Sequence, residues 1–278
     1  QQLAGAITGP GVSILNPVIS CGDSAYGEFS YTGSLLGLEE GIVLTTGRRT
    51  DALGPNNVGN RSFNSGTPGD AILDNVTGRD TYNRCRFEFD IIPTGDSLKF
   101  DFVFASEEYN EWVGSQFNDV FGFFISGPGI SGDPGIGADH NIALIPGTTT
   151  PVAINNVNNA LNSTFYADNT GGSELQYDGF TQGLSAEAIV QPCQTYHLKL
   201  IVADASDRLY DSGVFIERIE SPTITLSTYT LSGASDMVEA CNPGWIRFDR
   251  GDPRPTALTL QYFLQGTATN GSDYSAIG

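Results

Sequence analysis

Two groups of oxygen-bearing side chains stand where predicted strands end or begin, and together they could bind a cation. The first lies in FASEEYNEWVGSQFNDVFGFF, residues 104–124, where Glu107 and Glu108 end one apolar run and Asn118 and Asp119 precede the next. Carboxylate and amide oxygens are the ligands that calcium prefers, and about 6–8 of them surround one ion. The same residues would also suit an internal hydrogen-bonded cluster, or a solvated loop with Asx turns.

The second group lies in ADASDRLYDSG, residues 203–213, which contains Asp204, Asp207 and Asp211. Its spacing is not that of an EF-hand loop, and a turn whose aspartates cap backbone N–H groups would use the same sequence. Because both groups occur at strand ends, we expect them to form one acidic rim that binds calcium. The predicted metal ligands are Glu107, Glu108, Asn118, Asp119, Asp204, Asp207 and Asp211.

Three aromatic residues, Tyr109, Trp112 and Phe117, lie among the polar residues of the first group. Aromatic rings beside polar groups can stack on sugar rings or pack against a protein partner. We therefore predict that this loop binds an extracellular glycan or surface, or a partner protein. The simpler interpretation is that Trp112 covers the edge of the core.

The sequence contains little that points to catalysis. There is no G-x-S-x-G nucleophile motif, and neither of the two histidines has a recognisable triad setting. Glu107 and Asp119 would serve a glycosidase only if a cleft held their carboxylates at a working separation, which the sequence does not fix. We expect that the chain is not an enzyme.

The charge balance narrows the possible partners. The chain carries 32 acidic and 13 basic residues, which gives a formal net charge of −19. Such a surface repels nucleic acids and anionic membranes, and it attracts divalent cations. No run approaches the roughly 20 apolar residues that a membrane-spanning helix needs. We therefore expect no nucleic-acid partner and no direct membrane insertion.

The elements that would position these residues are short strands. Apolar and polar residues alternate in 86–93, 97–104 and 195–204, while 120–126 and 213–220 are apolar enough to be central strands. The turn Pro93–Asp96 predicts a hairpin between the first two segments. Glycine and proline are frequent and helical patterns are scarce, which favours an all-β, jelly-roll-like β-sandwich over residues 1–220.

A fresh run of alternating residues begins near Ser221 and Pro222. It predicts a second, incomplete immunoglobulin-like module over residues 221–278. Because the pattern stops at Gly278 without a closing strand, we expect that the chain continues, or that another chain supplies the remaining strands. The start at QQLAG is what removal of a leader would leave.

The four cysteines, Cys21, Cys85, Cys193 and Cys241, are widely spaced and even in number. This spacing suits disulfides in an oxidising compartment and not a zinc cluster. Four thiols allow three pairings, and spacing alone does not choose among them. We favour Cys21 with Cys85, because both lie in the first half of the chain.

Several long motifs resemble the choice-of-anchor L domain, in the right order over about residues 3–220. They are GIVLTTG (41–47), FDFVFASEEYNEWVGSQFNDVFGFFISGPG (100–129), IALIPGTTTPVAINNVN (142–158) and CQTYHLKLIVADASDRLYDSGVFIE (193–217). The resemblance implies a secreted, outer-membrane-associated protein of the bacterial cell surface, often in Bacteroidota. Such proteins are commonly exported by the type IX system and include very long gliding-motility adhesins. The domain has no enzymatic activity attached to it.

The tail LQYFLQGTATNGSDYSAIG, residues 260–278, resembles the first half of a Calx-beta module. Together the residues and the resemblances predict a non-catalytic, calcium-stabilised adhesive tip domain of a large secreted adhesin, which binds a glycan or surface. The alternative is a structural head that docks a partner protein during type IX export or filament assembly.

Overall fold

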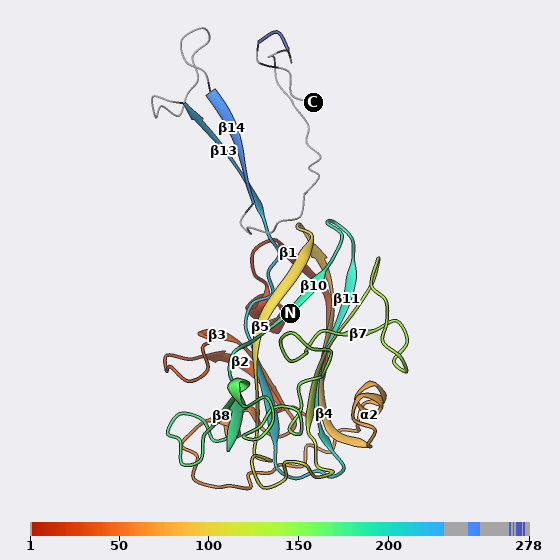
Figure 1. The fold of residues 1–278 in the computed structure, drawn as a ribbon, viewed down its shortest axis with the longest axis vertical. Coiled ribbons are helices and arrows are strands. Elements are labelled where there is room, and N and C mark those ends of the chain that lie inside the picture. Colours follow the sequence, from red (N-terminus) through yellow and green to blue (C-terminus); the bar gives the residue numbers. More distant parts are fainter. Residues whose placement is uncertain are drawn as a thin grey trace.

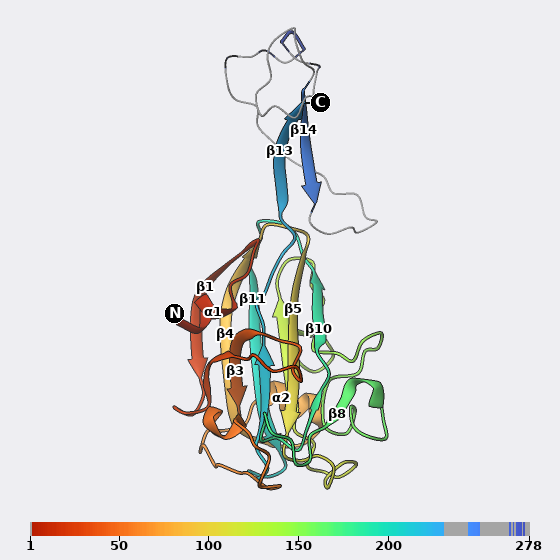
Figure 2. The same cartoon turned by 90° about the vertical axis from the view of Figure 1, so that its left-hand side faces the viewer.

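The computed structural model describes residues 2–230, 244–250, 267, 269, 271–273 and 275. Residues 2–220 form two antiparallel sheets that pack face to face, as Figures 1 and 2 show. The predicted all-β sandwich is therefore confirmed. Two short helices lie outside the sheets, α1 (Gln2–Ile7) and α2 (Ala71–Thr77), along with 3-10 turns at Arg49–Ala52 and Ser163–Phe165.

The first sheet has the strand order β1-β4-β11-β6-β7. Its strands are β1 (Val12–Ser20), β4 (Thr81–Pro93), β11 (Tyr196–Ala205), β6 (Val120–Ser126) and β7 (His140–Asn141). The long central strand β4 alternates buried and half-buried residues along its whole length. This is the pattern expected when one face of a strand covers a core and the other meets solvent.

The second sheet has the order β2-β3-β12-β5-β9-β8, and β10 pairs with β5. Its strands are β2 (Tyr26–Ser30), β3 (Glu40–Thr45), β12 (Ser212–Ile216), β5 (Ser97–Ser106), β9 (Gly179–Thr181), β8 (Tyr166–Asp168) and β10 (Leu184–Ile189). The strands nearest the middle, β12 and β5, are almost entirely buried, because further side chains cover both of their faces.

The core lies between the two sheets and is rich in phenylalanine. Phe100 of β5 stacks on Phe123 of β6, with ring centroids 3.9 Å apart. Each such buried ring contributes about 1.5–3 kcal/mol relative to exposure. The strand order corrects one expectation. Segments 86–93 and 97–104 do not form a hairpin, because β4 and β5 lie in different sheets and the turn Pro93–Asp96 connects one sheet to the other.

The outer strand β1 is interrupted. Its pairing with β4 shifts register between Leu15 and Val18, and Asn16 between them has a φ of 51°. The next residue, Pro17, has no N–H to donate. The pairing therefore bulges in the middle of this edge.

A disulfide fastens the segment after β1 to β4. Cys21 and Cys85 are joined, as the sequence analysis favoured, and Cys85 is buried in the core. Cys193 is exposed and has no disulfide partner among the described residues, and Cys241 lies outside them.

A separate hairpin follows the sandwich. Strands β13 (Ile224–Thr230) and β14 (Gly244–Arg250) pair antiparallel, and Figures 1 and 2 show them beyond the end of the sandwich to which β12 leads. The rest of the predicted second module, including the Calx-beta-like tail, falls largely outside the described residues, so that module remains a prediction.

Candidate functional site

The two predicted acidic groups meet at one end of the sandwich. Glu107 and Glu108 follow β5, Asp119 directly precedes β6, Asp204 lies near the end of β11, and Asp211 directly precedes β12. Since β5 and β12 belong to one sheet and β6 and β11 to the other, this end collects carboxylates from both sheets. All five residues are buried, with exposures of 0–2%. The rim is therefore a buried acidic centre, which we define as Glu107, Glu108, Asp119, Asp204 and Asp211.

Asp119 has hydrogen-bond donors for both carboxylate oxygens. The backbone N–H of Ala205 donates to Oδ1 at 2.8 Å, and the Ser212 hydroxyl donates to Oδ2 at 2.6 Å. These donors come from the end of β11 and the start of β12. Asp119 thus holds the β11–β12 loop against β6.

Asp204 and Asp211 have a donor on one oxygen only. The Asn83 side chain donates to Asp204 Oδ2 at 2.8 Å, and the Phe63 N–H donates to Asp211 Oδ1 at 2.8 Å. Within residues 2–230, the second oxygens, Asp204 Oδ1 and Asp211 Oδ2, are buried without a hydrogen-bond partner. Each buried oxygen left in this way costs about 1–3 kcal/mol.

Glu107 repeats this pattern, and Glu108 also has an unpaired oxygen. Glu107 Oε2 accepts a long hydrogen bond of 3.4 Å from the Arg61 N–H. Glu107 Oε1 and Glu108 Oε2 are buried and have no partner in the described part of the chain. The acidic centre therefore contains four carboxylates that each keep one unpaired oxygen.

Burial and mutual repulsion raise the pKa values of these groups. Burial, followed by the charge of Asp178, raises the pKa of Glu107 to about 8. Burial raises the pKa of Asp211 to about 7. Burial also raises the pKa values of Glu108, Asp119 and Asp204, and neighbouring carboxylates add to each shift. Near neutral pH the centre must retain protons or gain a compensating cation.

Two of the predicted ligands already accept backbone hydrogen bonds. Asn118 Oδ1 accepts the Asn155 N–H at 2.8 Å, and Asp207 Oδ1 accepts the Leu209 N–H at 2.9 Å. Both side chains are half-buried and lie beside the acidic centre. Asp207 therefore has the turn-capping role that the sequence offered as the alternative, whereas Asn118 holds a backbone segment distant in the chain.

The oxygen donors of the acidic centre suit calcium, but their arrangement does not form a coordination site. The centre offers hard oxygen donors and excess negative charge, which are what calcium requires. However, within the described residues no three His, Cys, Asp or Glu side chains are grouped so as to hold a metal ion. Binding would require side-chain rotation that brings the unpaired oxygens together.

The three predicted ligand-binding aromatics separate into two environments. Tyr109 is only 1% exposed, and its hydroxyl donates to the Val157 carbonyl at 2.8 Å. Its ring belongs to the core, so Tyr109 cannot stack on an external sugar, and that part of the prediction is wrong. Trp112 and Phe117 are half-buried, with ring centroids 5.1 Å apart.

Tyr210 completes this surface cluster, and the sequence analysis missed it. Its ring centroid lies 5.8 Å from that of Trp112. We call Trp112, Phe117 and Tyr210 the aromatic cluster. The available signal was the position of Tyr210 inside the second acidic loop, directly before Asp211. The sequence analysis also missed Asn83. The available signal was its position in β4, where it alternates in phase with the buried Cys85 and Phe87.

The two histidines lie away from this end. His140 Nδ1 is 2.6 Å from Asp133, and His197 Nδ1 is 2.9 Å from Asp90. His197 pairs across β11 and β4 with the half-buried Asp90 on the face that points away from the core. Neither histidine contacts a hydroxyl or thiol nucleophile through the hydrogen bonds found in residues 2–230.

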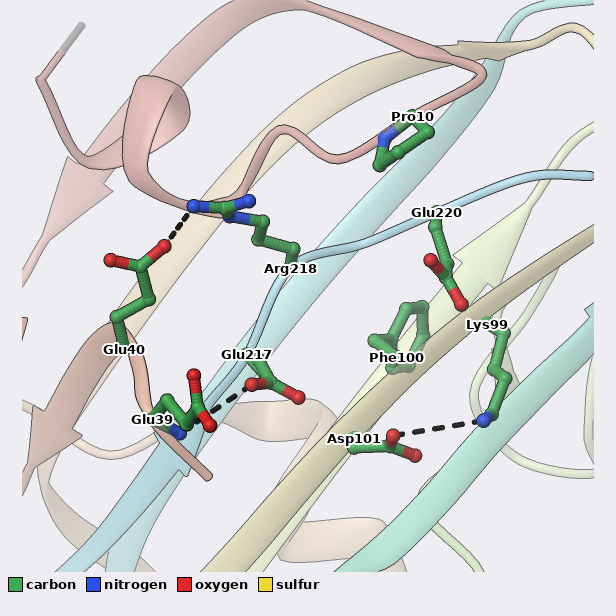
Figure 3. A pocket seen from close by; sticks show the side chains of 9 residues that line it. All are labelled: Pro10, Glu39, Glu40, Lys99, Phe100, Asp101, Glu217, Arg218 and Glu220. Atoms are coloured by element: carbon green, nitrogen blue, oxygen red, sulfur yellow. Dashed lines mark hydrogen bonds and ion pairs between the residues drawn. The ribbon is translucent and has the colours of Figure 1, made fainter. Parts of the chain in front are cut away.

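A second acidic surface shows what ordinary solvated carboxylates look like in this protein. Figure 3 shows a pocket of about 310 Å³ on the second sheet. Here Lys99 lies 3.6 Å from Asp101, and Arg218 forms an ion pair with Glu40. Glu40, Glu220 and their cationic neighbours are partly or fully exposed. Acidic residues there are exposed to solvent or paired with cations, in contrast to the buried acidic centre.

The fold and the buried acidic end define a β-sandwich domain with a structured loop face. Residues 1–220 match the Choice-of-anchor L domain, and the chain therefore belongs to this family. Membership identifies a protein associated with the cell surface, in a family that is not an enzyme family. A comparison with curated proteins gives no match. None of the helices in the described residues has the length and apolar character needed to cross a membrane.

Proposed function

We propose that this domain is the non-catalytic, adhesive head of a large secreted bacterial adhesin, stabilised by calcium and directed at a glycan or a solid surface. Export by the type IX system of a Bacteroidota bacterium, and a role in gliding motility, are part of the same proposal. The observation that carries it is the position of the aromatic cluster. Trp112, Phe117 and Tyr210 come from the two loops that also supply the buried acidic centre.

The acidic centre would act as the support of this contact face. Calcium would neutralise the buried carboxylates and hold the 107–119 and 204–211 loops in one arrangement. A fixed loop loses less entropy when it binds a ligand, which favours affinity. Trp112 and Tyr210 are half-buried, and the exposed parts of their rings would then contact sugar rings or a protein surface.

The burial of the acidic centre argues against catalysis, because a substrate would have no access to its carboxylates. A glycosidase needs two carboxylates that reach a sugar from an open cleft. Glu107 and Asp119 are both fully buried, so neither reaches a polysaccharide. Polysaccharide turnover that disappears in Glu107→Gln would contradict the non-catalytic proposal.

Binding to a glycan array and to abiotic beads tests the adhesive role, with and without EDTA. Trp112→Ala should lower binding, because it removes the central ring of the aromatic cluster. Ile189→Ala is the matched control, since Ile189 is 72% exposed and pairs with Ser97 at the other end of β5. Binding that survives both EDTA and Trp112→Ala would rule out this face as the adhesive site.

A docking head for a partner protein is the second candidate. It is favoured by the β13–β14 hairpin, where Leu226 and Ile246 are 63% and 40% exposed on the same face. An exposed apolar sheet face suits a protein partner. Co-purification of a stoichiometric partner that sugars do not displace would support this candidate over glycan adhesion.

A further inference from the structure

A cavity opens along one edge of the sandwich, in the seam between the two sheets. Its volume is about 550 Å³, within the range of about 300–1,000 Å³ that is usual for small-molecule sites. The outermost strands here are β1 of the first sheet and β2 of the second, and both line the cavity. The helix α1 contributes Gln2 and Leu3. This seam cavity shares no residue with the acidic centre or the aromatic cluster, so it is a separate feature of the molecule.

The inner wall of the seam cavity is apolar. Ile19 of β1 and Phe87 of β4 are cross-strand partners on the core side of the first sheet, and Phe87 is only 2% exposed. Tyr26 of β2 is half-buried and packs against the same core. The Cys21–Cys85 disulfide joins positions two residues from Ile19 and Phe87, which holds the wall in place. One face of a ligand can therefore cover a fixed apolar surface.

A carboxylate lies on the core-facing side of β2. Glu28 is two residues after Tyr26 and pairs with Ile42, which is fully buried between the sheets. Such a position is normally apolar, because it faces the core. Glu28 stays exposed because the seam is open beside it. Among the residues that the structure describes, its carboxylate forms no hydrogen bond or ion pair.

A cation lines the cavity from the edge of β2. Gly27, between Tyr26 and Glu28, faces the other side of the sheet, and a Cβ there would lie 2.6 Å from Cδ of Arg49. The Arg49 side chain therefore lies against bare backbone, and it lines the cavity together with Asp23. Both side chains are exposed, and neither has a hydrogen-bond or ion-pair partner within residues 2–230. The rim thus offers the N–H donors of one guanidinium and the acceptor oxygens of two carboxylates.

The chemistry of this rim suits a neutral ligand that is rich in hydroxyl groups. An anion would pair with Arg49 but would be repelled by Asp23 and Glu28, and a cation would meet the reverse arrangement. A hydroxyl both donates and accepts, so neighbouring hydroxyls satisfy a guanidinium and carboxylates together. A sugar ring adds an apolar C–H face for the aromatic wall. A second hollow of about 230 Å³ shares Glu28 and gives room for a further sugar unit.

We propose that the seam cavity binds consecutive units of a neutral oligosaccharide. Tyr26 contacts the apolar face of one ring, while Arg49, Asp23 and Glu28 form hydrogen bonds to its hydroxyls. The inference rests on the proposed adhesive function and adds a second contact, because the loop face contains none of these residues. Two contacts on one domain raise its avidity for a polymer that reaches both.

Isothermal titration of the whole chain with neutral oligosaccharides of glucose, mannose, galactose and xylose tests this assignment. The wild type should bind at least one of them. Glu28→Ala and Arg49→Ala should each weaken that binding about tenfold or more, because each removes hydrogen bonds to a charged group. Gly27→Ala should weaken it as well, since the new Cβ displaces Arg49. Glu28 and Arg49 are exposed, so their variants should melt at the wild-type temperature.

Glu187→Ala and Arg79→Ala are the matched controls. Both residues are exposed and lie outside the seam cavity, so the affinity should stay at the wild-type value. The titrations are repeated in Trp112→Ala, which removes the contact at the loop face. Binding that persists in Trp112→Ala and is lost when Arg49→Ala is added would support the seam site.

Three results would overturn the seam site. They are oligosaccharide binding that disappears in Trp112→Ala alone, binding that Glu28→Ala and Arg49→Ala leave unchanged, and a wild type that binds a lysine-rich peptide or a polyuronate but no neutral oligosaccharide. The first two would leave the proposed function intact. A wild type that binds neither oligosaccharides nor the glycan array and beads would overturn both.

Discussion

The Ser212 hydroxyl, at the start of β12, donates a 2.6 Å hydrogen bond to Oδ2 of Asp119, immediately before β6. This bond joins the two sheets of the sandwich inside the acidic centre. The Ser212 oxygen also lies 2.8 Å from the Ser106 hydroxyl at the end of β5. One small side chain thus connects three of the strands whose ends carry the acidic residues.

Ser212→Ala should therefore destabilise the domain. The substitution leaves a buried oxygen of Asp119 without its donor, at a cost of about 1–3 kcal/mol. Denaturant unfolding measures the loss. Ser185→Ala is the matched control, because Ser185 also donates to an aspartate, Asp101, but lies on the exposed surface. If both variants lose the same free energy of unfolding, the cross-sheet hydrogen bond stabilises the domain no more than a surface hydrogen bond does.

Stability in calcium-free buffer should fall as the pH rises. The pKa values of Glu107 and Asp211 are raised to about 8 and about 7, so the folded state keeps protons that the unfolded state releases above about pH 4. The unfolding free energy should therefore decrease between about pH 4 and pH 8. Melting temperatures measured from pH 5 to pH 8 in EDTA check this direction.

Added calcium should oppose that loss. An ion that binds the ionised carboxylates of the folded state raises stability by mass action, most strongly at the high end of the pH range. Melting curves at pH 8 with calcium and with EDTA should differ, and the difference should shrink at pH 5. A melting temperature in EDTA that rises with pH would contradict the assignment of these carboxyls as buried acids.

Gly47→Ala should disturb Asp211 directly. A Cβ built on Gly47 would lie 1.9 Å from Asp211 Oδ2, the oxygen that has no hydrogen-bond partner in residues 2–230. Overpacking of this kind costs about 1–3 kcal/mol. We expect a lower melting temperature and weaker calcium binding. Gly5→Ala in α1 is the control, because its Cβ would meet nothing within 4 Å and should leave both quantities unchanged.

Loss of the Cys21–Cys85 disulfide should cost more than any single hydrogen bond. The two cysteines are 64 residues apart, and a loop of that length corresponds to about 4 kcal/mol in the chain-entropy description. The double variant Cys21→Ala/Cys85→Ala is compared with wild type by denaturant unfolding. Cys193→Ser, at an exposed cysteine without a disulfide partner in the described residues, should match the wild type. An unchanged midpoint in the double variant would contradict the expectation.

The strands were predictable from sequence, but their partners were not. The alternation around Phe87 and Phe89 identifies which face of β4 is buried. It carries no information on which strand lies beside it, and a short turn such as Pro93–Asp96 can reverse the chain within a sheet or connect two sheets. The prediction that β4 and β5 form a hairpin was wrong for this reason.

The candidate site was predictable in its location but not in its burial. Glu107 and Asp211 stand at strand ends in the sequence, and strand ends of a sandwich meet at its rim. That this rim is covered depends on distant segments. Loop 61–63 donates backbone N–H groups to both residues. Tyr109 was misassigned for the same cause, since its hydrogen-bond acceptor, Val157, is far along the chain.

The interrupted edge strand β1 has a consequence for crowding on a cell envelope. Flat, regular edges allow neighbouring copies to zip together into fibrils. Asn16 and Pro17 break the row of donors and acceptors on this side, and β7 at the opposite side is only two residues long. Both edges of the first sheet are therefore poor templates for lateral pairing with a neighbouring copy.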